Sequence, residues 1–85
     1  MNTSNKSYAG LDIIATENRI AKCIKESGIG DKELGEMMHI SIQAVNKWRH
    51  GRSIPEVENL YLLSRILGKR VDDLLIPKTT RREGS

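Results

Sequence analysis

The chain has 85 residues, a formal net charge of +3 and a single cysteine. This length predicts one small domain, and one cysteine excludes a disulfide framework within the chain, as expected in a reducing cytosol. The mild positive charge is compatible with a polyanionic partner. We see no secretory leader and no apolar stretch of transmembrane length, so we expect a cytoplasmic protein with no membrane partner.

Residues 1–15 are predicted to form a flexible or extended arm. Residues 1–10 are polar and contain Asn, Ser and Gly, a composition that favours disorder. Residues 11–15 (LDIIA) are apolar, and could lie extended on the domain or form an early turn of helix. We favour the extended conformation, because the run is short and Thr16 is a suitable residue to begin a helix.

The first helix is predicted over residues 16–27. Ile20, Cys23 and Ile24 recur at the helical period and form one apolar stripe. Gly28 follows, as glycine often does just past a helix end. Because Cys23 continues the stripe, we assign it to the core rather than to a chemical site.

The central stretch, residues 31–51, is predicted to form two short helices. They span residues 31–38 and 42–50, so only three residues remain for the turn. Two helices joined this tightly must cross steeply, as in a helix-turn-helix unit. Ser41 can cap the second helix, while Val45 and Trp48 share its inward face.

Two residues are suited to this crossing. Gly35 stands where the two backbones should come closest, since a larger side chain would push them apart. His39 begins the turn, where φ is commonly positive, and histidine is among the residue types enriched there.

Two further helices are predicted, over residues 56–67 and 71–75. Gly68 should end the longer helix, and Pro77 should stop the shorter one. The folded domain is therefore expected to cover residues 16–76. Residues 77–85 are predicted to be a disordered, charged tail.

The pattern resembles the lambda-repressor-like helix-turn-helix domain of the xenobiotic-response-element class of bacterial and phage regulators. The resemblance covers roughly residues 16–76, and is carried by Leu34, Gly35, Ile40, Ser41, Val45, Trp48, Gly51, Ile54-Pro55, Glu58-Asn59-Leu60, Leu63, Leu67-Gly68 and residues 71–75. It implies an all-α, compact five-helix domain that binds specific double-stranded DNA. It further implies a homodimeric transcriptional regulator on an inverted-repeat operator, more commonly a repressor, although the sequence leaves activation open.

The outward face of the second central helix is the candidate base-reading surface. It consists of Ile42, Gln43, Asn46 and Lys47, which offer amide donors and acceptors and a positive charge. These groups suit the base edges of a major groove. An ordinary solvated helix face would look similar, but the family pattern favours a role in DNA reading. For Ile42 two positions stay open, against a thymine methyl group or tucked against the turn.

The resemblance implies phosphate contacts at Lys32, Ser41 and Arg52, and Arg49 is a further candidate; generic surface charge is the alternative. The chain departs from its relatives at Asp31, where Gln commonly contacts phosphate; a carboxylate would repel phosphate, so we do not transfer that contact. A second departure replaces a frequent Arg–Glu pair by Ile24 and Arg49. Since both partners of that pair are replaced, Arg49 is expected to be free to face phosphate or solvent.

Leu62 and Ile66 lie away from the predicted inner face of their helix, and we expect them to be exposed and to form a dimer interface. The two histidines are too few and too scattered for a metal site. We find no nucleophile–base arrangement, cofactor motif or small-molecule site, so we expect no enzyme. The competing interpretation is a protein-interaction module, such as an antitoxin, that uses the same fold.

Overall fold

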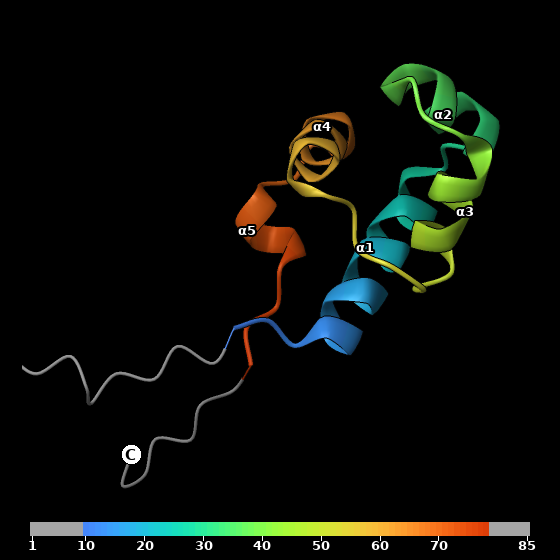
Figure 1. Ribbon diagram of the computed structural model, residues 1–85. Helices are drawn as coiled ribbons and strands as arrows, with labels where there is room; N and C mark the ends of the chain where they lie inside the picture. Colours follow the sequence, from blue (N-terminus) through green and yellow to red (C-terminus); the bar gives the residue numbers. More distant parts are fainter. Residues whose placement is uncertain (1–9, 79–85) are drawn as a thin grey trace, which may run out of the picture.

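The computed structural model describes residues 10–78, which form five helices and one isolated β-bridge (Figure 1). The helices are α1 (Ile13–Ser27), α2 (Asp31–Met38), α3 (Ile42–Arg49), α4 (Val57–Leu67) and α5 (Val71–Leu74). α1 contacts α3, α4 and α5, while α2 packs on α3 and α4. This arrangement confirms the all-α fold. No helix within residues 10–78 is long and apolar enough to cross a bilayer.

α1 begins at Ile13, three residues before the expected start. The Asp12 carboxylate accepts a hydrogen bond from the backbone N–H of Ala15 at 3.0 Å and so caps the first turn. The prediction of an extended segment was therefore wrong for residues 13–15, and only Leu11 and Asp12 have extended backbone. The disorder predicted for residues 1–10 and 77–85 mostly concerns positions outside the described residues, but the Lys78 N–H donates to the Gly10 oxygen at 2.9 Å.

Thr16 ties the two ends of the fold together. Its side chain is fully buried, and its hydroxyl donates to the carbonyl oxygen of Ile76 at 3.3 Å and accepts from the Ile76 N–H at 3.0 Å. Beside it, Leu11 and Pro77 form an antiparallel bridge. Pro77 therefore belongs to a short ordered pairing, one position beyond the expected end of the domain.

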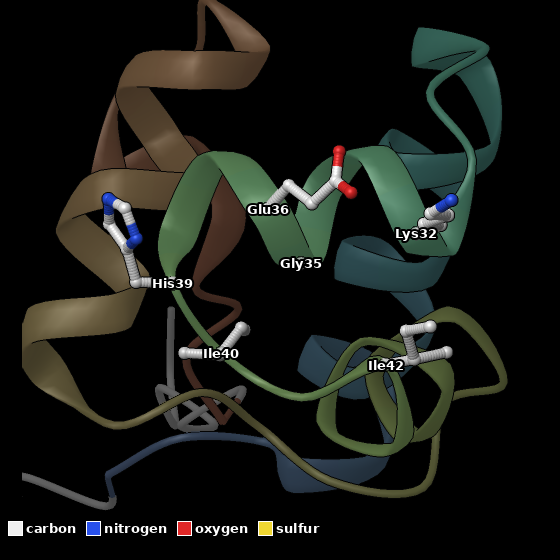
Figure 2. A pocket seen from close by; sticks show the side chains of 6 residues that line it. All are labelled: Lys32, Gly35, Glu36, His39, Ile40 and Ile42. Carbon is white, nitrogen blue, oxygen red and sulfur yellow. The ribbon is translucent and has the colours of Figure 1, made fainter.

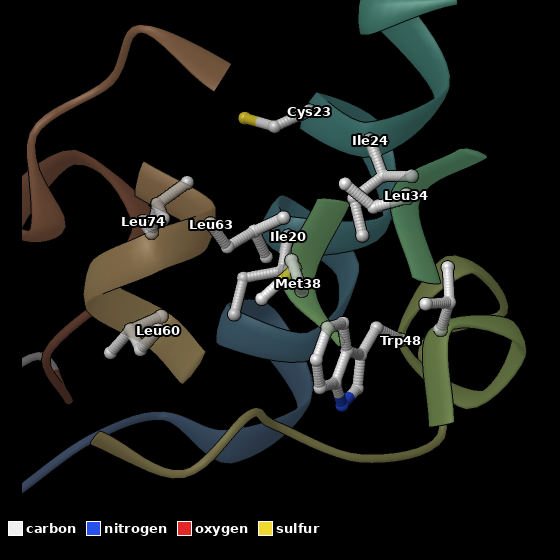
Figure 3. Packing of buried hydrophobic residues seen from close by; sticks show 10 residues of the cluster. Ile20, Cys23, Ile24, Leu34, Met38, Trp48, Leu60, Leu63 and Leu74 are labelled. Carbon is white, nitrogen blue, oxygen red and sulfur yellow. The ribbon is translucent and has the colours of Figure 1, made fainter. Parts of the chain in front are cut away.

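One core joins α1, α2, α3, α4 and α5 (Figure 3). Its buried side chains are Ile20, Cys23, Ile24, Leu34, Met38, Val45, Trp48, Leu60, Leu63 and Leu74. The core positions predicted for Cys23 and Trp48 are confirmed. A buried Trp48 and Val45 fix the rotation of α3 about its axis, so that its opposite side faces solvent.

Leu62 and Ile66 are half-buried and pack against this core, so the prediction that they are exposed was wrong. α4 packs against three helices, α1, α2 and α5, and this widens its inner face. The large apolar side chains that α4 does expose are Val57 and Tyr61, at 85% and 53%.

The turn between α2 and α3 has the expected geometry. His39 has φ 58°, and the Ile40 N–H donates to the Gly35 carbonyl oxygen at 3.0 Å. A Cβ atom added at Gly35 would lie 3.0 Å from the backbone oxygen of Ile40, which confirms the close approach predicted there. Ser41 Oγ caps α3 by accepting from the Ala44 N–H at 3.1 Å.

We predict that Thr16→Val detaches the backbone of Ile76 from α1 and leaves the rest of the fold in place. Valine keeps the shape but removes both hydrogen bonds to Ile76, which should lower the free energy of unfolding by about 1–3 kcal/mol. Amide hydrogen exchange measured by NMR should show the Ile76 N–H losing its protection. Thr16→Ser is the matched control, because it keeps the hydroxyl and should keep that protection. An Ile76 amide still protected in Thr16→Val would contradict the assignment.

Candidate nucleic-acid interface

The solvent side of α3 carries a row of polar side chains. Gln43, Asn46, Lys47 and His50 follow one another at helical spacing, and Gln43 and Lys47 are exposed. Lys47 lies in the last turn of α3, where a cation also complements the helix dipole. Two amides and a cation therefore share one face of a short, firmly packed helix.

Ile42 lies at the edge of this row, beside the turn. Its side chain is 49% exposed. With Ile40, Gly35, Lys32, Glu36 and His39 it lines an open concavity of about 420 Å³ between α2 and the start of α3 (Figure 2). Half of the side chain thus remains available to a ligand on the α3 face, while the rest borders the turn.

Three of the predicted phosphate contacts are exposed near helix ends. Lys32 lies in the first turn of α2 and Ser41 is the N-cap of α3. Because Ser41 Oγ uses a lone pair to accept from Ala44, its O–H remains available as a donor. Arg52 follows α3, where its backbone N–H donates to the Lys47 carbonyl oxygen at 2.8 Å.

Arg49 is not free, contrary to the sequence-based expectation. Its Nε donates to Asp31 Oδ1 and its Nη2 donates to the backbone oxygen of Ile29. The side chains of Arg49 and Asp31 are only 24% and 22% exposed. Arg49 therefore fastens α3 to the beginning of α2, and this contact withdraws much of its guanidinium from solvent.

Asp31 is the residue that the sequence interpretation missed. Both of its carboxylate oxygens have partners on α3, since Asn46 Nδ2 donates to Oδ2 at 3.1 Å. A signal existed: Asp31 and Arg49 are both departures from the family pattern and carry opposite charges. The two residues are 18 positions apart in the sequence, so patterns within a single helix do not indicate that they are paired.

The hydrogen bond from Arg49, and then that from Asn46, lower the pKa of Asp31 below its ordinary value. The folded state thus binds the Asp31 proton less readily than the unfolded chain. The corresponding stabilisation is fully present above the ordinary carboxyl pKa, and is lost as the pH falls through the lower pKa of the folded state.

We predict that Asp31→Asn removes this part of the acid sensitivity. At pH 7 the variant should be less stable than wild type by about 1–2 kcal/mol, because an amide carries no charge to pair with Arg49 and cannot accept from both Arg49 and Asn46 through separate oxygens. This difference should shrink when urea unfolding is repeated below about pH 3.5, under the ordinary pKa of Asp. Glu33→Gln is the control, since it removes an exposed carboxylate from the same turn. A constant difference between Asp31→Asn and wild type at every pH would contradict the linkage.

The crossing of α2 and α3, with the polar side of α3 turned outward, defines a helix-turn-helix DNA-binding domain. Residues 20–74 match the model of the lambda-repressor-like helix-turn-helix family HTH_3, which is the xenobiotic-response-element class. The chain belongs to this family of DNA-binding regulators. Comparisons with curated proteins and with solved structures gave no match.

Proposed function

We propose that this protein represses transcription as a homodimer, by placing α3 in the major groove of an inverted-repeat operator. The observation that carries the proposal is the polar row on α3, in which Gln43 and Lys47 are exposed and Asn46 is half-buried, opposite a buried Trp48. A helix of this kind, lying across a promoter, would exclude other proteins from it. The family match supports the DNA binding on which repression would depend.

Gln43, Asn46 and Lys47 are the base-reading side chains in this proposal. Gln43 and Asn46 each pair a donor with an acceptor, the combination that matches the major-groove edge of adenine. Lys47 supplies donors suited to guanine. The exposed half of Ile42 borders this row and fits a thymine methyl group.

Lys32, Ser41 and Arg52 are the proposed phosphate contacts. They lie at the start of α2, at the cap of α3 and just beyond α3, and all three are exposed. We now give Arg49 a structural role, because its contacts with Asp31 and Ile29 hold it inside the domain. Phosphate contacts would set the position of α3 without reading sequence.

The proposed homodimer forms through α4, but through Val57 and Tyr61 and not through Leu62 and Ile66. Val57 and Tyr61 lie one turn apart and are exposed, whereas Leu62 and Ile66 are occupied by the core. The Arg65 guanidinium carbon lies 5.9 Å from the centre of the Tyr61 ring, which orders part of that surface. A two-fold contact there would present two copies of α3 to one duplex.

Selection from a random pool of duplexes tests the function. We expect an enriched inverted repeat with half-site centres about one helical turn, ~10 base pairs, apart. A single half-site or a direct repeat would contradict the two-fold dimer. Retention of no sequence over another would contradict specific binding and would favour the protein-interaction module.

Gln43→Ala and Arg52→Ala should distinguish a side chain that recognises bases from one that contacts the phosphate backbone. Gln43→Ala should lose about 1–3 kcal/mol of discrimination at one base pair per half-site, while its affinity for scrambled DNA barely changes. Arg52→Ala should weaken all sequences equally and make the salt dependence shallower by roughly one unit per lost contact.

The measurement is affinity for selected and scrambled duplexes over a salt series. If Gln43→Ala weakens both duplexes alike, or Arg52→Ala alters base preference alone, the two roles are wrongly assigned.

A further inference from the structure

Asn46 differs from the other side chains of the α3 row, because another helix holds it. Its Nδ2 donates to Asp31 Oδ2 at 3.1 Å, and the residue is half-buried, whereas Gln43 and Lys47 are exposed. An asparagine amide carries two N–H groups and one oxygen. Asp31 uses one N–H, so one N–H and Oδ1 remain for a ligand.

We propose that Asp31 is a positioning residue for base specificity, which fixes the orientation of the Asn46 amide before DNA arrives. This inference rests on the proposed function, in which α3 reads base edges. The groups left on Asn46 are then a donor and an acceptor at fixed places. Adenine presents the complementary pair, N7 and N6–H, in the major groove.

The carboxylate enforces one of two amide orientations. A half-turn of the Asn46 amide would replace its N–H by Oδ1 opposite Asp31, so a hydrogen bond would give way to repulsion between two acceptors. Without Asp31, both orientations would be accessible, and Asn46 could offer a donor where it previously offered an acceptor. Discrimination at its base pair would then fall.

Asp31 is itself held firmly enough for this role. Its other oxygen, Oδ1, accepts from Arg49 Nε, and Arg49 also donates to the Ile29 backbone oxygen. Asp31 is the first residue of α2, where a negative charge is favourable. A carboxylate fixed at both oxygens cannot turn away to release the amide.

The same arrangement weakens general attraction to DNA. Asp31 adds a negative charge beside the reading face, and it engages the guanidinium of Arg49. Loss of Asp31 should therefore have two opposite effects, stronger binding to any duplex and weaker discrimination among duplexes. A residue that only stabilised the fold would not raise affinity for scrambled DNA when removed.

The test uses the full chain with Asp31→Ala, and measures affinity for the selected operator, its single-base variants and scrambled DNA over a salt series. Discrimination should fall roughly tenfold at one base pair per half-site. Affinity for scrambled DNA should rise, and the salt dependence should become steeper by about one unit as Arg49 is released. Glu33→Gln is the matched control: it removes a charge from the same turn and should leave every base preference unchanged.

A double variant identifies Asn46 as the intermediary. Asn46→Ala should flatten preference at the same base pair, and adding Asp31→Ala should flatten it no further. Unchanged base preference in Asp31→Ala, or additive losses in the double variant, would overturn the inference while leaving the proposed function intact. If Asp31→Ala does not fold, Asp31→Asn is the second variant: its amide oxygen can still accept from Arg49 Nε, and its N–H groups then face Asn46, so the Asn46 amide should turn over and the base preference at that pair should change. A wild-type chain that selects no sequence would refute the proposed function and this inference with it.

Discussion

The position of α3 depends on the approach of the α2 backbone to the turn that follows it. At Gly35 there is room for a hydrogen atom and for little more, because a Cβ atom would meet the Ile40 oxygen at 3.0 Å. The positive φ of His39 turns the chain within the same few residues. Val45 and Trp48 can then reach the core, and Gln43 and Lys47 are left exposed on the other side of α3. The direction of the polar row on α3 thus depends on a close backbone contact between α2 and the turn.

Charged side chains have two different environments within this unit. Lys32, Lys47 and Arg52 leave their charges in solvent, where they can attract phosphate over a Debye length of about 8–10 Å. Arg49 and Asp31 instead neutralise each other between α2 and α3. Salt should screen the exposed charges more strongly than the Asp31–Arg49 pair, whose side chains are only 22% and 24% exposed.

Most of the fold could be predicted because its signals are local. Helical periodicity, the Ser41 cap, and the glycines after α1 and α4 each act within about one turn, and each was recognised in the sequence. The first turn of α1 depends on the Asp12 cap, and the short apolar run alone favours an extended segment over this turn. Contacts between distant residues were harder: Thr16 was interpreted as a helix start, although its hydroxyl bonds a residue 60 positions away. The width of the inner face of α4, which covers Leu62 and Ile66, depends on three neighbouring helices and has no local signal. The Asp31–Arg49 pair also joins residues that are distant in the sequence, and for this reason Arg49 was expected to be free for a phosphate contact.

The pairing of Leu11 with Pro77 has a consequence for the connectivity of the chain. The first and last described residues are neighbours, since the Lys78 N–H donates to the Gly10 oxygen at 2.9 Å, and Figure 1 places them far from α2 and α3. A short covalent joint between residues 10 and 78 would therefore require no rearrangement, and the chain could be circularly permuted with new ends in another surface loop. The helices could then follow one another in a different order along the chain and still pack in the same arrangement. What the helix-turn-helix unit needs is the uninterrupted run from α2 through α3, wherever the chain is cut elsewhere.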